Sequence, residues 1–243
     1  MTSKAKVFLV VLSVLFFVAY AVIFIFTPDI VNSLTLEDHL YENQQAICDL
    51  GVSIVFFYLF LKVKEGNDFH FIKTRRNIFF LLLALLFFFG FGEEISWGQR
   101  IFHWQTPAWM AKANVQDETD LHNLEIFNYE NFQGQRKSFW ADMLDFNRIY
   151  SFFWFSFCFA IPLLCLLFKR FSNWMQRLKL PVIPLWMGVL FPLNYLVSKI
   201  IQSYFMNNSW KYFSEVKESV FALLFAGLSL WILSESHKLI LPT

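Results

Sequence analysis

Long runs of apolar residues alternate with short polar segments along the whole chain. Six of these runs approach the roughly 20 residues that a helix needs to cross the hydrocarbon core of a bilayer. They lie at about residues 7–27, 40–62, 77–95, 149–168, 181–204 and 217–234. This pattern predicts an all-α fold, a polytopic membrane helix bundle with about six transmembrane helices, in which residues 1–243 form a single transmembrane domain.

Basic residues are concentrated in alternate connections between these runs. Lys4 and Lys6 precede the first run, whereas the first connection, residues 29–42, contains no Lys or Arg. The second and fourth connections are basic and carry Lys62, Lys64, Lys73, Arg75, Arg76, Lys169, Arg170, Arg177 and Lys179. Because positively charged loops stay in the cytoplasm, we expect both termini inside and a long extracytoplasmic segment at about 96–148.

The bulk composition supports a membrane protein and excludes some partners. Hydrophobic residues make up 57% of the 243 residues, which is more apolar surface than a soluble domain of this length can bury. The net charge of +1 provides no basic field for nucleic acid. The cysteines lack the CxxC spacing of a metal or redox site, so we interpret them as small core residues. No small-x-small site follows the first run, so we interpret it as a retained span and not a cleaved signal.

A stripe of polar residues enters the second apolar run. Its members, spaced by four, three and four residues, are Asp38, Glu42, Gln45 and Asp49. This spacing places them on one face of a helix. Such a face must point to the bundle interior or to a water-filled cleft, because lipid cannot solvate it. Thr35 followed by Asp38 resembles a helix N-cap, which predicts that the helix begins near Leu36.

Two adjacent carboxylates, Glu93 and Glu94, lie where the third run ends. A carboxylate at mid-membrane costs at least roughly 2.5 to 3.5 kcal/mol, so such a pair normally has a partner or a function. We expect this helix to continue to about Trp104. Positions 93, 97 and 100 then share a face, which brings Trp97 and Arg100 next to Glu93. Glu94 points about 100° away from that face.

Further polar groups lie near the outer ends of the remaining runs. In the third connection, Thr106-Pro107 predicts the start of a short helix that lies at the membrane interface. The polar residues that follow it are Asp117, Glu118, Asp120, His122, Asn123 and Glu125. The fifth run carries Asn194, Ser198 and Gln202 at helical spacing, and Glu215 and Glu218 precede the sixth run. In the expected topology, all of these groups lie toward the outer leaflet.

Together these groups suit acid–base chemistry on a headgroup. The candidate catalytic residues are Glu93, Glu94, Arg100 and His122, and the candidate substrate-binding residues are Asp38, Glu42, Trp97, Gln99, Glu215 and Glu218. Carboxylates act as general acids or bases when their surroundings tune their protonation, and Arg100 would hold a phosphate. Carboxylates with one His also suit a divalent metal, but no HExxH pattern is present, so the sequence specifies no metal or other cofactor. The chain lacks a GxSxG block, which disfavours acyl-enzyme chemistry.

Each of these groups also has a purely structural interpretation. Glu93 and Arg100 would form an ordinary ion pair, and His122 would be a solvated loop residue. Trp97, Trp104 and Trp109 match an aromatic belt at the membrane interface. Glu215 and Glu218 match the acidic first turn of a helix. The stripe in the second run has more members than a single tolerated pair would need, so we favour a functional interpretation there.

Several sequence blocks resemble known families. The blocks are Glu37-Asp38, GEEISWGQR from Gly92 to Arg100, Thr106-Pro107, and LHNL from Leu121 to Leu124. They resemble a family of bacterial integral-membrane proteins without an assigned activity, over about a third of the chain. The regions 94–99 and 120–123 are also similar, with a longer insert between them, to VanZ-like membrane proteins, a group linked to lipid and cell-wall headgroup chemistry. The resemblance implies a location in the bacterial cytoplasmic (inner) membrane.

The sequence therefore supports three hypotheses. The leading one is a membrane enzyme that modifies a lipid or lipid-linked headgroup, by hydrolysis or group transfer, in a polar cleft open to the outer leaflet. The alternatives are a proton- or cation-coupled transporter that uses the same carboxylates, and a non-catalytic membrane subunit. A transporter needs a polar route through both leaflets, and the cytoplasmic halves of the predicted helices carry only isolated polar groups, which favours the enzyme. The expected partner is a membrane lipid or lipid-linked substrate, with no oligomeric state specified.

Overall fold

The protein folds as a bundle of helices, which confirms the predicted all-α class. A computed structural model describes residues 2–26, 28–35, 39–69, 72–114, 118–128, 135, 137–205 and 213–236. Four helical segments in these ranges are long and apolar enough to cross a membrane, namely Ser3–Val22, Leu40–Lys62, Phe146–Leu167 and Ser214–Glu235. The structure is therefore compatible with a membrane protein that has four candidate spans in the described part of the chain.

The six predicted apolar runs all correspond to helical segments. In chain order these are α1 (Ser3–Ile25), α3 (Leu40–Lys62), α4 (Ile78–Glu94), the joined segments α8 (Phe146–Trp154), η3 (Phe155–Ala160) and α9 (Ile161–Leu167), then α12 (Leu190–Phe205) and α13 (Phe213–Glu235). α4 and α12 have 17 and 16 residues, which is shorter than the roughly 20 residues that an upright span needs. For these two helices, membrane crossing stays a prediction.

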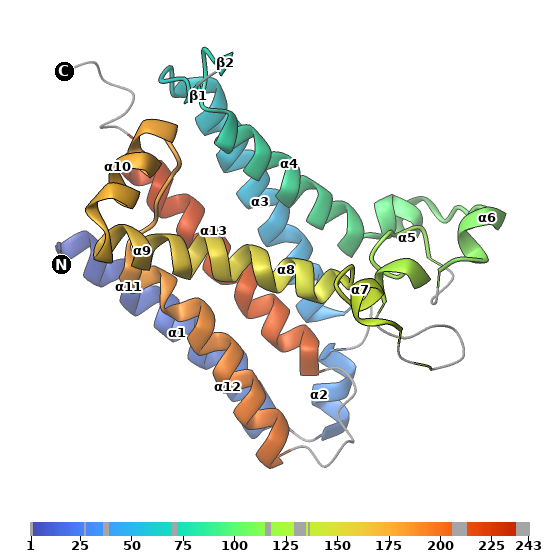
Figure 1. Ribbon diagram of the computed structural model, residues 1–243. Coiled ribbons are helices and arrows are strands. Elements are labelled where there is room, and N and C mark those ends of the chain that lie inside the picture. Colours follow the sequence, from blue (N-terminus) through green and yellow to red (C-terminus); the bar gives the residue numbers. More distant parts are fainter. Residues whose placement is uncertain are drawn as a thin grey trace.

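α13 is the central helix of the bundle. It packs against α1, α3 and α12, and α3 packs in turn against α4 (Figure 1). Within the candidate span of α13, 61% of the residues are buried, compared with 22–33% in the other three spans. α13 therefore joins the α3–α4 pair to the rest of the protein.

Short elements connect the long helices. They are α2 (Pro28–Thr35), η1 (Ser96–Gly98), α5 (Gln99–Phe102), α6 (Ala108–Ala111), η2 (Glu125–Phe127), α7 (Phe139–Asp142), α10 (Lys169–Leu178), α11 (Leu185–Gly188), and the antiparallel hairpin of β1 (Asp68–Phe69) and β2 (Ile72–Lys73). The hairpin and α10 lie at the same end as the start of α1 and the end of α13, which we call the terminal end (Figure 1). α2 and α5–α7 lie at the opposite end, which we call the loop end.

Direct contacts hold the terminal end together. Lys4 Nζ donates to Glu235 Oε1 at 3.1 Å, and Asn67 Nδ2 donates to the carbonyl oxygen of Leu178 at 2.7 Å. These bonds join the first helix to the last and the second connection to the fourth. The two helix ends near the termini and the second and fourth connections therefore lie at one end of the bundle, as the charge pattern predicts. The membrane side that each end faces stays a prediction.

An aromatic layer fills the middle of the bundle and consists of Phe56, Phe87, Phe153, Phe191 and Phe225. The ring of Phe225 lies 4.8 Å from that of Phe87 and 4.8 Å from that of Phe191, centroid to centroid. Phe87 also stacks on Phe56 at 6.2 Å and meets Phe153 edge-on at 6.4 Å. Such ring pairs stabilise a core beyond the area that they bury. The layer therefore forms an apolar section of the core between the two ends of the bundle.

The second helix begins later than the sequence predicts. Thr35 is the last residue of α2, a separate helix that begins at Pro28, and α3 begins only at Leu40 with the extended residue His39 as its N-cap. The predicted start near Leu36 is therefore wrong. The signal that was missed is Pro28, because proline favours the first position of a helix. Asp38 lies outside the described residues.

The third helix is also shorter than expected. α4 ends at Glu94, and Ser96, Trp97 and Gly98 take positive φ values of 46°, 51° and 90°. Left-handed conformations cannot continue an α-helix, so the predicted continuation to Trp104 is wrong. After this turn the chain forms only the short helix α5. The predicted helix after Thr106 is present as α6, with Pro107 in the N-cap position.

A proline explains the irregular segment between α8 and α9. Pro162 has no N–H to donate to the carbonyl group of Cys158, four residues earlier, and its ring would collide with that group. The chain widens into the π-helical turn η3 immediately before Pro162. A Cβ atom on Gly188 would lie 2.0 Å from the Cys158 carbonyl oxygen, so only glycine lets α11 pack here. The predicted fifth run is split into α11 and α12.

Candidate functional site

Carboxylates from three helices converge at the loop end. We call this group the acidic cluster, and its members are Glu42 and Asp49 of α3, Glu94 of α4, and Glu215 and Glu218 of α13. The charges of the other four members all act on the Glu94 carboxyl group. These residues are up to 176 positions apart in the chain. The packing of α3 between α4 and α13 is what brings them together.

Gln45 connects the polar stripe of α3 to the acidic cluster. Its Nε2 atom donates to Glu94 Oε1 at 2.6 Å. The Oε1 atom of the same amide is buried and has no hydrogen-bond partner. A buried amide oxygen without a partner is uncommon because its desolvation costs free energy. The stripe of Glu42, Gln45 and Asp49 thus faces α4 and not lipid, as its spacing predicts.

Asp49 is the most deeply placed member of the stripe. Its side chain is 8% exposed and forms no hydrogen bond within the described residues. A Cβ atom on Gly90 of α4 would lie 3.0 Å from Asp49 Oδ2. Glycine at position 90 therefore makes room for the carboxyl group between the two helices. A buried carboxyl group without a hydrogen bond is costly, so it is a strong candidate for a functional residue.

Glu93 has quite different surroundings from its neighbour Glu94. It is 4% exposed, and its Oε1 atom accepts the indole N–H of Trp97 at 2.6 Å. Its Oε2 atom accepts the backbone N–H groups of Leu121 and His122, both at 2.7 Å, and lies 3.2 Å from His122 Nδ1. One carboxylate therefore holds a loop segment from 28 residues away against the end of α4.

Trp97 lies beside Glu93 as predicted, but a turn and not a continued helix places it there. The positive φ values at positions 96–98 fold the Trp97 ring back over α4, where it packs against Phe89 with ring centroids 5.8 Å apart. A Cβ atom on Gly92 would lie 3.0 Å from this ring. Gly92 therefore provides the close approach, and Gly98 accommodates the left-handed backbone.

A second set of hydrogen bonds fixes the loop that carries His122. Asp120 is fully buried and accepts bonds from Asn114 Nδ2 at 2.6 Å and from Asn123 Nδ2 at 2.8 Å. Gln99 Oε1 accepts the backbone N–H of Thr119 at 2.6 Å. These bonds tie the loop to α5 and to itself, although the buried Oγ1 atom of Thr119 has no hydrogen-bond partner among the described residues.

His122 lies between these loop contacts and the acidic cluster. Burial opposes its protonation, but the hydrogen bond with Glu93 and the negative charges of Asp120 and Glu93 outweigh burial and raise the pKa of His122. The charges of Glu218 and Glu215 also interact with this imidazole. Burial raises the pKa of Asp120. Carboxylates from the loop, α4 and α13 therefore favour the protonated form of His122.

The residues predicted from the sequence fall into three groups. Glu42, Glu94, Glu215, Glu218 and His122 come together at the loop end. Glu93, Trp97 and Gln99 form the bonds that hold the loop. Arg100 is a residue of α5 whose side chain lies outside the described atoms, and Asp38 lies outside the described residues. Sequence reasoning did not find Asn114, because an isolated asparagine in a loop carries no distinctive spacing.

Among the described residues, no three His, Cys, Asp or Glu side chains are arranged to hold a metal ion. Comparison of the chain with protein-family models, with curated proteins and with solved structures finds no match. A function is therefore inferred from the chemistry of the residues themselves.

Proposed function

We propose that this protein is a membrane enzyme that modifies a lipid or lipid-linked headgroup, by hydrolysis or group transfer, at the acidic cluster. The observation that carries the proposal is the convergence on Glu94 of four further carboxylates from α3 and α13, beside His122, whose pKa is raised by its acidic neighbours. Carboxyl groups that share one low-dielectric space cannot all be ionised together. Such a group can both accept and donate a proton, which is what acid–base catalysis needs.

The proposal assigns different roles to the two adjacent glutamates. Glu94, which faces the other acids, would accept a proton from the attacking hydroxyl group or water, and Asp49 would return a proton to the leaving oxygen. Glu93 would act as a positioning residue, because its oxygen atoms already accept three N–H groups from the loop and Trp97. Arg100 would bind the phosphate of the headgroup, a role that comes from the sequence alone.

The aromatic layer supports an enzyme over a transporter. On each of three helices, one acid of the cluster is seven residues from a phenylalanine of the layer: Asp49 and Phe56, Glu94 and Phe87, Glu218 and Phe225. Seven residues span about 10 Å along a helix and return to the same face. The layer therefore lies directly behind the acids, where a proton or cation route to the other end would have to pass.

The proposed setting follows the charge pattern. Both termini would lie in the cytoplasm of a bacterial cell, and the loop end would face the outer leaflet of the inner membrane. α2 and the segment from α5 to α7 would then lie at the level of the headgroups. A lipid would reach the acidic cluster from that leaflet.

The test compares cells that carry Glu94→Gln with wild-type cells and with cells that carry Asp68→Asn. Asp68 lies in the hairpin at the terminal end, and its side chain is 68% exposed. Asp68→Asn is therefore the matched control, because it also removes one carboxylate. The proposal predicts an altered lipid profile with Glu94→Gln and an unchanged one with Asp68→Asn. An unchanged profile with Glu94→Gln, together with lost proton or cation flux in liposomes, would favour a transporter. An unchanged profile and an unchanged flux would indicate a non-catalytic subunit.

A further inference from the structure

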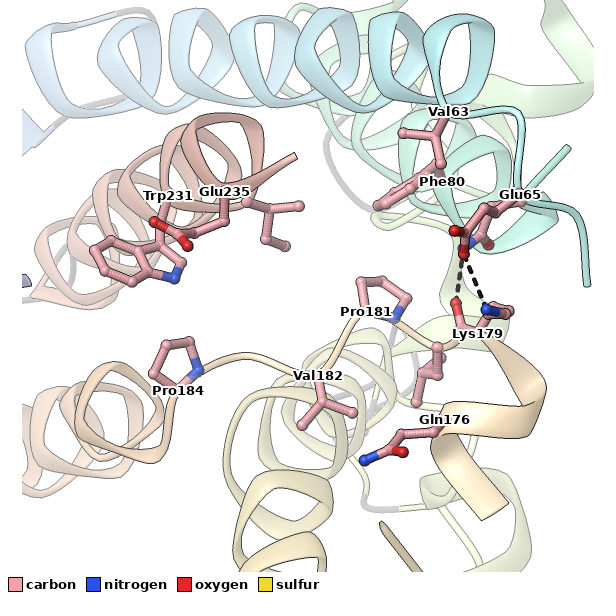
Figure 2. Close-up of a pocket in the computed structure, with 13 residues that line it drawn as sticks. Val63, Glu65, Phe80, Gln176, Lys179, Pro181, Val182, Pro184, Trp231 and Glu235 are labelled. Atoms are coloured by element: carbon pink, nitrogen blue, oxygen red, sulfur yellow. Dashed lines mark hydrogen bonds and ion pairs between the residues drawn. The ribbon is translucent and has the colours of Figure 1, made fainter. Parts of the chain in front are cut away.

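A cavity at the terminal end is separate from the acidic cluster. It has a volume of about 480 Å³ and lies between α13, the ends of α3 and α4, and the segment that follows α10 (Figure 2). Val63 and Phe80 form one apolar wall, and Trp231 of α13 forms the opposite one. The length of the helices separates this cavity from the acids at the loop end, because Phe80 of the cavity and Glu94 of the acidic cluster lie near opposite ends of α4.

The rim of the cavity carries charges of both signs. Lys179 Nζ donates to Glu65 Oε2 at 2.9 Å, and both side chains are about half exposed, at 46% and 47%. Glu235, which pairs with Lys4 at 3.1 Å, lies on the other side of the cavity. The mouth of this cavity therefore carries two ion pairs, Lys179–Glu65 and Lys4–Glu235, and has charges of both signs.

The position of Lys179 is fixed by its backbone. Its φ is 55°, and its carbonyl oxygen accepts a hydrogen bond from Asn77 Nδ2 at 2.7 Å. The carbonyl oxygen of the preceding residue, Leu178, accepts one from Asn67 at 2.7 Å. Asn67 and Asn77 are themselves buried. The Lys179 ammonium group thus projects from a rigid turn and not from a loose loop.

An apolar groove continues from this cavity along the outside of the bundle. It has a volume of about 200 Å³ and lies between Phe79 and Leu82 of α4 and Phe157 of η3. Leu180 lines both the groove and the cavity. At the loop end the gap between α4 and α8 is closed, because Phe89 stacks on Phe146 with centroids 6.0 Å apart. The groove is thus a blind slot that begins at the charged rim.

We infer that the cavity and groove together bind one zwitterionic phospholipid. Its phosphate would contact Lys179, its ammonium group would contact Glu65 or Glu235, and one acyl chain would follow the groove beside α4. Two ion pairs match a zwitterionic headgroup better than an anionic one, because each charge of a zwitterion can meet a charge of opposite sign. A soluble ligand would leave the apolar groove without an occupant, whereas a lipid fills both parts.

The test measures phospholipid bound to the purified full-length protein in detergent, by native mass spectrometry, with added phosphatidylethanolamine or phosphatidylglycerol. Lys179→Gln removes the ammonium group, and Val182→Trp fills the cavity from its rim. Lys73→Gln is the matched control, because Lys73 pairs with Asp68 at the same end but does not line the cavity. We expect both cavity variants to weaken phosphatidylethanolamine binding about tenfold, the equivalent of one charge-assisted hydrogen bond.

The control variant should bind the lipid as the wild type does. Equal binding by Lys179→Gln and Lys73→Gln would overturn the inference. Tighter binding of phosphatidylglycerol than of phosphatidylethanolamine by the wild-type protein would overturn it as well, and this comparison needs no variant to fold. Neither outcome depends on the acidic cluster, so this inference and the proposed enzyme function can fail separately.

Discussion

The Nδ1 atom of His122 lies 3.2 Å from the Oε2 atom of Glu93, which also accepts two backbone N–H groups of the same loop. This contact joins the last turn of α4 to a segment about 30 residues later and places an imidazole beside the acidic cluster. The loop, the helix end and the cluster are therefore one structural unit. A substitution in the loop, the helix end or the cluster should therefore alter the structure of the other two.

Replacing Glu93 with alanine should release the loop from α4. The substitution leaves two half-buried backbone N–H groups and the indole of the partly exposed Trp97 without their acceptor. A fully buried donor without a partner costs about 1–3 kcal/mol, and these donors cost less because water can reach them in part. We therefore expect a loss of at least ~2 kcal/mol in the free energy of unfolding, measured by thermal unfolding in detergent. Limited proteolysis should show faster cleavage between α5 and α7. The exposed control Asp68→Asn should change the free energy by less than ~0.5 kcal/mol. Equal stability of the two variants would contradict the described role of Glu93.

The stability of the loop should depend on pH through His122. Burial alone would favour the neutral ring, but the bond to Glu93 and the charge of Asp120 raise the pKa of His122 above its ordinary value of 6.5. The folded protein thus binds this proton more tightly than the unfolded chain does. The resulting stability is fully present below pH 6.5 and is lost as the pH rises through the raised pKa.

The measurement is the melting temperature of the wild-type protein and of His122→Gln across this pH range. The difference between the two proteins should be largest near pH 6 and should shrink at alkaline pH. A difference that stays constant or grows with pH would show that the imidazolium does not stabilise the fold.

Two glycines in neighbouring helices should respond oppositely to alanine. A Cβ atom on Gly51 of α3 meets nothing within 4 Å, so Gly51→Ala should stabilise the helix by about 0.5–1 kcal/mol. A Cβ atom on Gly90 of α4 would lie 3.0 Å from Asp49 Oδ2. Gly90→Ala should therefore displace the Asp49 carboxyl group and should not stabilise the protein as Gly51→Ala does. Thermal unfolding of the two variants measures the contrast, and lipid conversion should fall only with Gly90→Ala. If Gly90→Ala stabilises as much as Gly51→Ala, Asp49 is not confined against α4.

The sequence predicts the helices better than it predicts the turns between them. Apolar runs locate every long helix because burial and lipid contact both depend on local composition. The spacing of Glu42, Gln45 and Asp49 predicts the face of α3 that meets α4. The break after Glu94 could not be predicted in the same way, since the residues at 95–97 are compatible with a helix and only Gly98 gives a local signal.

In the candidate site, too, local features can be predicted from the sequence and contacts between distant residues cannot. Residue type and depth identify Glu94 and the acids of α3 and α13 as candidates. The contrast between Glu93 and Glu94 depends on N–H groups of Leu121 and His122, and contacts over such a chain distance leave no periodic pattern. A sequence alone therefore identifies the pair but cannot assign different roles to its two members.

The most direct test of the acidic cluster is lipid conversion by the purified protein in vesicles of total bacterial inner-membrane lipid. The wild-type protein is compared with Asp49→Asn, and with Asp68→Asn as the same change at the terminal end. We predict that Asp49→Asn lowers the rate of lipid conversion at least about 100-fold, as for the loss of a general acid or base. The melting temperature of Asp49→Asn should stay near that of the wild type. Asp68→Asn should convert lipid at about the wild-type rate. Equal conversion by Asp49→Asn and Asp68→Asn, or no conversion by the wild-type protein, would contradict the account.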